Sequence, residues 1–401
     1  MDFIISVLYM MGQVFLDILI SPAFIILYLL IFLLVGWQYK RMETSSRSIV
    51  QSKKRTYIKS TLTSIMFGLI GGLVGSILLV FTGIDLHSIG IGYLWLIAIV
   101  LMLINPRYLC FAYAGGILAG LNLIFAYPQV NIPQLMGLVA ILHMVESILI
   151  LLNGPLFALP IYVKKNNAIR GGFNLQKFWP LPLIALVGVG IAEPASGITM
   201  PDWWPLFQDY SQSAENKIYT LLPVLAILGY GEITTTSSPV DRCRKTAFYL
   251  FLYSLTLLVL SVFSAKWAIF LPAAALFSPL GHELVIWLGI QEEKAKPSLY
   301  TRPLEGVGVL AIEPNTMASR IGIEAGDNII RLNDKAITCN ANLIDLVNHE
   351  GRLEFTVKRN NANISIRGRK GMGEELGLIL VPDNEVKRYL TFKKPRRKNR
   401  P

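Results

Sequence analysis

The chain has 401 residues, of which 53% are hydrophobic and 16% are charged, and its formal net charge is +11. Soluble domains carry about 25% charged residues, so the composition excludes an ordinary water-soluble protein for most of the chain. Residues 1–290 form nearly continuous apolar blocks, whereas residues 291–401 have the composition of a soluble domain. We therefore expect the first part to lie in a membrane and the second part to lie in water.

Apolar segments near the length of a transmembrane helix, roughly 20 residues, recur through the first part. Four of them contain no charged residue: 18–37, 62–84, 108–126 and 246–265. Five others are short, long or interrupted by proline: 89–105, 133–162, 180–192, 218–231 and 267–290. We predict an α-helical polytopic membrane bundle of about 7–9 spans, in which 180–192 and 218–231 borrow flanking residues or re-enter the membrane. Before the first span, residues 2–17 are either an amphipathic surface helix or the start of a tilted span.

Basic residues mark alternate loops. Seven lie in 38–60, four in 163–179 and three in 241–245, and the positive-inside rule places these segments in the cytoplasm. The other loops hold a single basic residue, Lys217, and are predicted to face outward: 85–88, 127–132 and 194–217. The last of them carries aromatic residues suited to an interfacial belt: Trp203, Trp204, Phe207 and Tyr210. The excess positive charge is explained by these loops, where it sets the orientation of the chain in the membrane. We therefore expect no nucleic-acid binding.

Two further patterns concern packing within the membrane part. Small residues recur four apart at Gly68, Gly72 and Ser76, and again at Gly116 and Gly120. Such spacing lets helices approach closely, either within the bundle or in a homodimer.

The three cysteines are scattered without a CxxC pair, which argues against a disulfide framework or a structural zinc site.

Residues 297–384 change to soluble patterning. A predicted strand at 307–312 leads into EPNTMASRIGIEAGDNIIRLNDKAI at 313–337. This run has a proline, a short helix, a hydrophobic–Gly–hydrophobic step, Gly326-Asp327, a strand and an Asn-Asp turn, and in that order it resembles the core of PDZ domains. Gly326 suits a turn with positive φ, and Asp327 can accept hydrogen bonds from nearby backbone donors. A helix at 341–350 and strands at 353–358 and 363–367 complete a small α+β unit.

The PDZ resemblance implies a peptide-binding groove. In that family a peptide adds as a strand between a sheet edge and a helix. A circularly permuted arrangement would form the groove from an edge strand and from the 341–350 helix, with candidate residues Leu376, Gly377, Leu378, Ile379, Leu343 and Val347. Residues 306–309 are the alternative loop, and core strands without a ligand are the other possibility.

The last residues, 385–401, form a basic tail with KKPRRKNR at 393–400. On anionic lipid each basic residue near the surface gains about 1 kcal/mol, and a solvated tail is the alternative.

We expect no enzyme, no cofactor and no metal site, because no catalytic or metal-ligating set is complete. His282-Glu283 begins the HExxH motif of intramembrane zinc proteases, but Ile286 stands where the second histidine belongs. His143 and Glu146 share a helix face within an apolar block. Such a pair either satisfies itself inside the bundle or contributes to a proton or ion pathway.

The whole layout resembles the MinJ-like cell-division topology proteins of Gram-positive rods. It combines a multi-span domain at 1–290, the SPLGHE stretch at 278–283 and a terminal PDZ-like domain at 297–384. The resemblance implies a scaffold at septum and poles of the bacterial cell membrane, linking a DivIVA-like coiled coil to a MinD-like ATPase. The alternatives are a PDZ adaptor in membrane-protein quality control or secretion, a transporter and a degenerate intramembrane metalloprotease.

Overall fold

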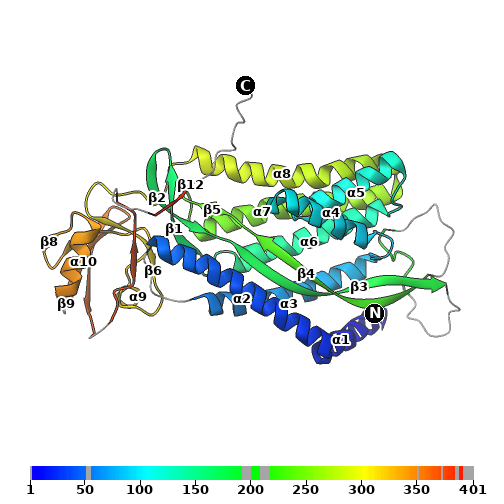
Figure 1. The fold of residues 1–401 in the computed structure, drawn as a ribbon, viewed down its shortest axis with the longest axis horizontal. Helices are drawn as coiled ribbons and strands as arrows, with labels where there is room; N and C mark the ends of the chain where they lie inside the picture. Colours follow the sequence, from blue (N-terminus) through cyan, green and yellow to red (C-terminus); the bar gives the residue numbers. More distant parts are fainter. Residues whose placement is uncertain are drawn as a thin grey trace, which may run out of the picture.

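A computed structural model describes residues 2–50, 56–191, 200–207, 217–349, 352–371, 374–383 and 388–391. The long helices lie side by side along one axis, and a small C-terminal unit sits at one end of them (Figure 1). The N-terminus lies toward the opposite end. The chain therefore has two parts, a bundle of long helices, called the membrane part below, and a smaller C-terminal unit.

Six helices in the described part of the chain are long and apolar enough to cross a membrane. They are α1 (Asp2–Ile20), α2 (Pro22–Val50), α3 (Tyr57–Thr82), α6 (Ile132–Asn153), α7 (Pro239–Lys266) and α8 (Leu271–Ala295). α1 is a helix of its own, since Pro22 starts the next one. The expected number of spans stays a prediction.

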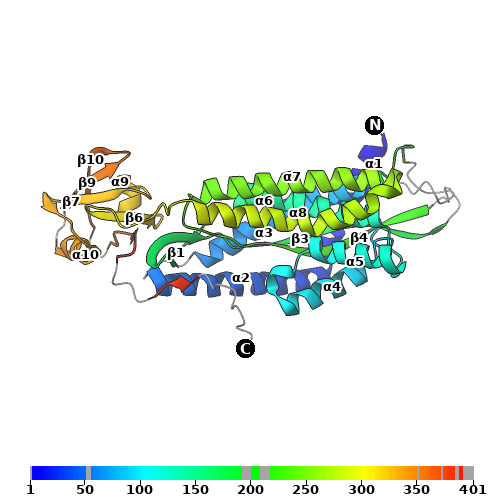
Figure 2. The same ribbon diagram turned by 90° about the horizontal axis from the view of Figure 1, so that it is seen from above.

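Two helices that are too short to cross a bilayer lie beside each other in the membrane part. α4 (Ile91–Ile104) and α5 (Phe111–Phe125) have 14 and 15 residues. At 1.5 Å per residue they are about 21–23 Å long, less than the roughly 30 Å of a bilayer core. Pro106 disfavours helical backbone at Asn105, which ends α4. Both helices lie along the half of the bundle away from the C-terminal unit (Figure 2).

A long β-hairpin runs through the membrane part. β3 (Lys177–Ile191) pairs with β4 (Lys217–Tyr230) in antiparallel register, from Lys177 opposite Tyr230 to Ile191 opposite Lys217. The prediction that 180–192 and 218–231 are membrane helices was therefore wrong. Pro180, Pro182 and Pro223 lie inside these segments, and proline is disfavoured in the interior of a helix. Short apolar runs do not by themselves distinguish strand from helix.

Prolines and hydrogen bonds to α2, α3 and the α3–α4 connection cover the edge of β3 that faces away from β4. Pro180 and Pro182 have no N–H group to leave unpaired on that edge. Three N–H groups on this edge donate to side chains: Phe178 to Tyr39 Oη at 3.2 Å, Ile184 to Ser76 Oγ at 2.8 Å and Gly188 to Asp85 Oδ1 at 3.0 Å. Leu186 forms a backbone bridge with Asp85 on the same edge. This matters because an unpaired backbone group is costly where water is absent.

The small-residue ladder on α3 packs against this strand. A Cβ at Gly68 would collide with the Pro180 carbonyl oxygen, and one at Gly72 would collide with that of Pro182. Packing within the chain is thus the use of Gly68 and Gly72. On α5, Gly116 packs against Pro279, whereas a Cβ at Gly120 would have no neighbour within 4 Å among the described residues. A homodimer formed through the small residues of α5 stays a prediction.

A second sheet caps the end of the bundle that carries the C-terminal unit. Its order is β12 (Leu390–Thr391), β1 (Leu159–Lys165), β2 (Ala168–Asn174) and β5 (Ile233–Thr234). The expected long span at 133–162 therefore ends at Asn153, where α6 ends. The start of the 385–401 tail returns to this sheet as β12, and the basic run 393–400 lies outside the described residues.

The C-terminal unit is a sheet with two helices. Its elements are β6 (Val307–Ile312), α9 (Met317–Ile321), β7 (Asn328–Leu332), β8 (Lys335–Ala336), α10 (Asn340–His349), β9 (Arg352–Arg359), β10 (Ala362–Arg369) and β11 (Leu378–Leu380). The sheet order is β10-β9-β7-β6-β11, with β8 on β7. The strands predicted at 307–312, 353–358 and 363–367 and the helix predicted at 341–350 are all present.

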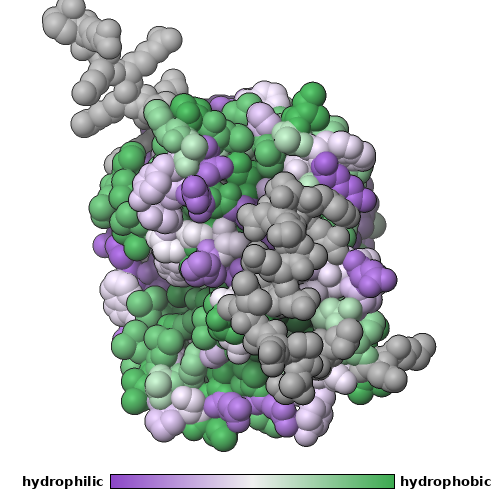
Figure 3. All heavy atoms as spheres, turned by 90° about the vertical axis from the view of Figure 1, so that its right-hand side faces the viewer, coloured by the Kyte–Doolittle hydropathy of each residue, from purple (hydrophilic) through white to green (hydrophobic). Residues whose placement is uncertain are grey.

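The two ends of the bundle differ in character. The basic segments at the end of α2, in β1 and β2 and at the start of α7 lie at the end that carries the C-terminal unit (Figure 1). The opposite end shows polar side chains among apolar ones (Figure 3). There, Trp203 is exposed, but Phe207 is buried against Gly137, so Phe207 is a core residue and not part of an aromatic belt. Tyr210 lies outside the described residues.

Candidate functional site

The turn before β7 is built around Asp327. Gly326 has φ +95°, as its place in the pattern predicted, and Asp327 Oδ2 accepts a hydrogen bond from the Glu324 N–H at 2.8 Å. Arg359 binds both carboxylate oxygens of Asp327 at 2.7 Å, and these hydrogen bonds raise the pKa of the guanidinium. Arg359 was not predicted, because it lies on β9, 32 residues away. The pair fixes the turn to the sheet.

β11 is the edge strand that the sequence suggested as one side of a groove. The Glu313 N–H donates to the Gly377 carbonyl at 2.8 Å on the side of β6. Backbone groups alternate along a strand, so those of Leu378 point toward the opposite edge. Gly377 has φ +75°, and a Cβ there would collide with Thr316. The alternative loop at 306–309 leads into β6, which lies between β7 and β11 and is not an edge.

The six predicted groove residues have different roles in the structure. Leu343 and Val347 are only 1% and 4% exposed and belong to the core of the C-terminal unit, with Leu376 and Leu378 packed against it. Ile379 faces the other way and belongs to the core shared with the membrane part. Leu343 and Val347 can therefore form the floor of a groove, but not its accessible surface.

The accessible part of α10 beside β11 is Ile344. Asn340, at the start of this helix, donates from Nδ2 to the Val381 carbonyl at 3.0 Å, just beyond β11. Ile344 lies one turn further along the same face and is 56% exposed. An exposed isoleucine at this place offers an apolar contact for a peptide. The candidate residues taken from the sequence were the buried Leu343 and Val347, and Ile344 of the same helix was not among them.

The membrane part also touches this edge. Tyr162 on β1 donates its hydroxyl hydrogen to the Leu380 carbonyl at 2.9 Å. Burial raises the pKa of Tyr162 to about 12, so the hydroxyl keeps its proton at neutral pH. The position of the C-terminal unit is therefore coupled to the sheet that caps the bundle.

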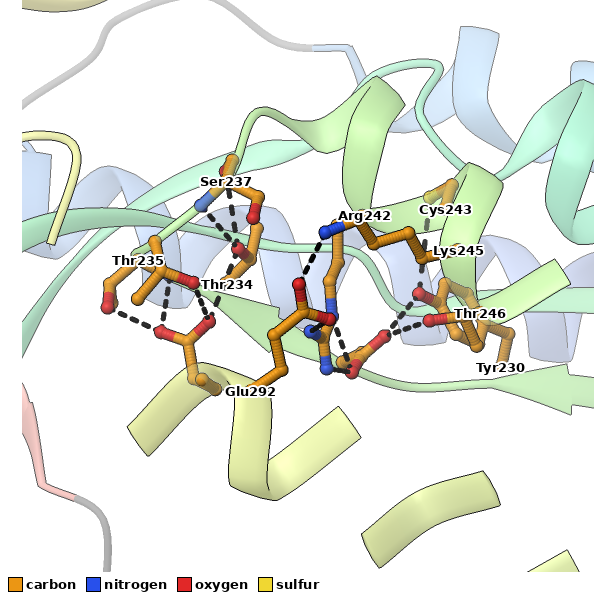
Figure 4. Close-up of polar contacts among 12 residues, drawn as sticks. Tyr230, Thr234, Thr235, Ser237, Arg242, Cys243, Lys245, Thr246 and Glu292 are labelled. Carbon is orange, nitrogen blue, oxygen red and sulfur yellow. Dashed lines mark hydrogen bonds and ion pairs between the residues drawn. The ribbon is translucent and has the colours of Figure 1, made fainter. Parts of the chain in front are cut away.

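A polar network fastens the end of α8 to the start of α7 and to the β4–β5 turn (Figure 4). Arg242 is 2% exposed and forms ion pairs with Glu232 and Glu292. Glu293 accepts hydrogen bonds from the N–H of Thr235 at 2.8 Å and from the hydroxyl of Thr236 at 2.8 Å. This network anchors the helix from which the C-terminal unit extends.

The linker beyond α8 is also held by backbone hydrogen bonds. The Leu299 N–H donates to the Thr235 carbonyl at 2.8 Å, and the Gly171 N–H donates to the Tyr300 carbonyl at 3.0 Å. The C-terminal unit is therefore docked on the bundle.

The SPLGHE stretch lies on α8 and packs along α5. Ser278 Oγ donates to the Ala112 carbonyl at 2.8 Å, and Pro279 packs on Gly116. Glu283 pairs with Arg107 and accepts a hydrogen bond from Tyr113 at 2.7 Å. Glu283 is thus a partner of the α4–α5 turn, which meets α8 about half-way along its length.

The same level of the bundle brings together Cys110, His143 and His282. These residues come from the start of α5, the middle of α6 and the middle of α8. Cys110 Sγ lies 3.2 Å from His143 Nε2 and 3.7 Å from His282 Nε2. Glu146 is one turn beyond His143 on α6. No short sequence spacing could have revealed this cluster, because its members lie on three helices.

No family model matches the chain. The chain is 25% identical over 371 residues to the cell division topological determinant MinJ of Bacillus subtilis (strain 168). The match covers 86% of this chain and 87% of that protein. Coverage of 86% cannot fit within residues 1–290, so the similarity includes both the membrane part and the C-terminal unit. The chain is therefore distantly similar to MinJ over most of its length.

Proposed function

We propose that this protein is a membrane-anchored scaffold of cell-division topology that binds division regulators through its C-terminal unit. The observation that carries the proposal is the similarity to MinJ, because it extends over both parts of the chain. We infer that the C-terminal unit is a PDZ-like domain in the cytoplasm. Its partners would be a DivIVA-like coiled-coil protein and a MinD-like ATPase at septum and poles.

The structure supports a binding role for this unit in three ways. β11 is a sheet edge beside a helix, the arrangement by which peptides add as strands. Ile344 supplies an exposed apolar contact at that edge. The unit is docked through Tyr162 and Tyr300 at the bundle end where basic segments gather, which suits a cytoplasmic face. The proposed action is binding, without catalysis.

Localisation of a fluorescent fusion of the full chain tests the proposal. Wild type should concentrate at septa and poles, and Ile344→Lys should spread evenly around the membrane at unchanged abundance. Ile364→Lys is the matched control, since Ile364 is 38% exposed on β10, at the opposite edge of the same sheet. Even distribution of wild type would remove the division role. Septal enrichment of all three would move partner binding away from this groove.

A further inference from the structure

Cys110, His143 and His282 have the separations of ligands around one metal ion. One nitrogen or sulfur atom from each lies within 4.8 Å of the other two. Zn–S and Zn–N bonds of about 2.3 and 2.0–2.1 Å place sulfur and nitrogen about 3.5 Å apart in a tetrahedral site. The two sulfur–nitrogen separations here, 3.2 and 3.7 Å, lie on either side of that value. Both sulfur–nitrogen separations therefore lie within a few tenths of an ångström of the value for a tetrahedral site.

His143 is arranged as a metal-binding histidine usually is, and His282 presents one ring nitrogen to the same sulfur atom. His143 Nδ1 lies 2.7 Å from the Val139 carbonyl oxygen. A proton on Nδ1 donates to that carbonyl, which leaves the Nε2 lone pair directed at Cys110. His282 Nδ1 is buried and has no hydrogen-bond partner among the described residues. Nε2 therefore makes the polar contact of the His282 ring, and that contact is with Cys110.

We propose that Cys110, His143 and His282 bind a transition-metal ion, Zn²⁺ or Cu⁺, that links α5, α6 and α8 in the middle of the membrane part. Thiolate and imidazole ligands favour these ions over Mg²⁺ and Ca²⁺, which prefer oxygen. The ion would act as a structural cross-link that holds the α4–α5 turn against α8. Aromatic rings enclose the cluster, with Tyr253 at 5.4 Å from His143 and Tyr113 at 5.3 Å from His282, centroid to centroid.

Charge distinguishes the two ions. A Cu⁺ ion and one thiolate are neutral together, whereas Zn²⁺ and one thiolate carry one positive charge, which is unfavourable within a membrane. Glu146 lies one turn from His143 on α6 and can supply the balancing negative charge. Glu146→Gln should therefore lower Zn²⁺ content and leave Cu⁺ content unchanged, which identifies the ion.

Elemental analysis of the full-length protein, purified in detergent with a histidine-free tag, tests the site. We expect about one Zn or Cu per chain in wild type, and less than about a fifth of that in Cys110→Ser, His143→Gln or His282→Gln. His87→Gln and Cys243→Ser are the matched controls, because His87 and Cys243 lie outside the cluster, and they should retain the metal. No metal in wild type, or equal metal in ligand and control variants, would overturn the proposal.

A second measurement does not require any ligand variant to fold. Replacing Cys243 and Cys339 by serine leaves Cys110 as the single thiol of the chain, which has three cysteines. After incubation of this variant with Co²⁺, we expect a thiolate-to-cobalt charge-transfer band in the near ultraviolet. The band should disappear when Cys110 is alkylated. A missing band, or one that survives alkylation, would mean that Cys110 is not a ligand.

Discussion

The contact between α3 and the buried hairpin predicts that Gly68 and Gly72 do not tolerate even one methyl group. In Gly72→Ala the new Cβ would lie 2.9 Å from Pro182 Cδ and would collide with the Pro182 carbonyl oxygen. That oxygen belongs to a strand paired with β4 on its other side, so it cannot retreat cheaply. Overpacking of this kind costs about 1–3 kcal/mol.

The matched control is Gly120→Ala on α5. A Cβ there would have no neighbour within 4 Å among the described residues. Alanine is favoured over glycine inside a helix by up to about 1 kcal/mol, so this variant should be neutral or stabilised. Unfolding of the purified protein in mixed micelles, followed by tryptophan fluorescence, measures the difference. If Gly68→Ala and Gly72→Ala behave like Gly120→Ala, the hairpin does not pack against α3.

Three further predictions concern polar contacts. Arg242→Met should destabilise the membrane part by about 3 kcal/mol in the same unfolding assay, because Glu232 loses its buried partner; Arg244→Met, on the exposed side of that turn, should have little effect. Arg359→Ala should destabilise the C-terminal unit by about 2 kcal/mol, less than a fully buried pair because Arg359 is 24% exposed; Arg367→Ala, whose pair with Glu354 is exposed, should show no measurable change in thermal melting. Tyr162→Phe should weaken docking of the C-terminal unit by about 1 kcal/mol, seen as faster proteolysis of the 296–306 linker; an unchanged cleavage rate would mean that the hydrogen bond to Leu380 does not hold the unit.

The C-terminal unit could be predicted from the sequence because its signals are local. Gly326 and the Asn333-Asp334 pair mark turns that need positive φ, and all three residues adopt it. Strand alternation and the 341–350 helix are equally short-range patterns. Even so, Leu343 and Val347 were chosen as candidate peptide-binding residues, and the structure buries both in the core of the unit. Which helix face is accessible depends on what packs against it, and that is a tertiary fact.

The membrane part was predicted less well because its decisive contacts are long-range. Segments 180–192 and 218–231 are as apolar as a helix, and hydropathy alone does not show that a strand can be satisfied by Tyr39, Ser76 and Asp85. The prolines in these segments were the available signal against a helix, because proline is disfavoured in helix interiors. The Cys110, His143 and His282 cluster joins three helices, so no spacing along the chain could reveal it.

Site-specific photo-crosslinking in dividing cells tests the central claim, that the C-terminal unit binds division regulators at the β11–α10 edge. A crosslinking amino acid replaces Ile344 in one strain and Ile364 in another, both in the full-length chain. The account predicts that the probe at 344 captures a DivIVA-like coiled-coil protein or a MinD-like ATPase, and that the probe at 364 does not. Capture of secretion or quality-control proteins alone, or equal capture from both positions, would contradict it.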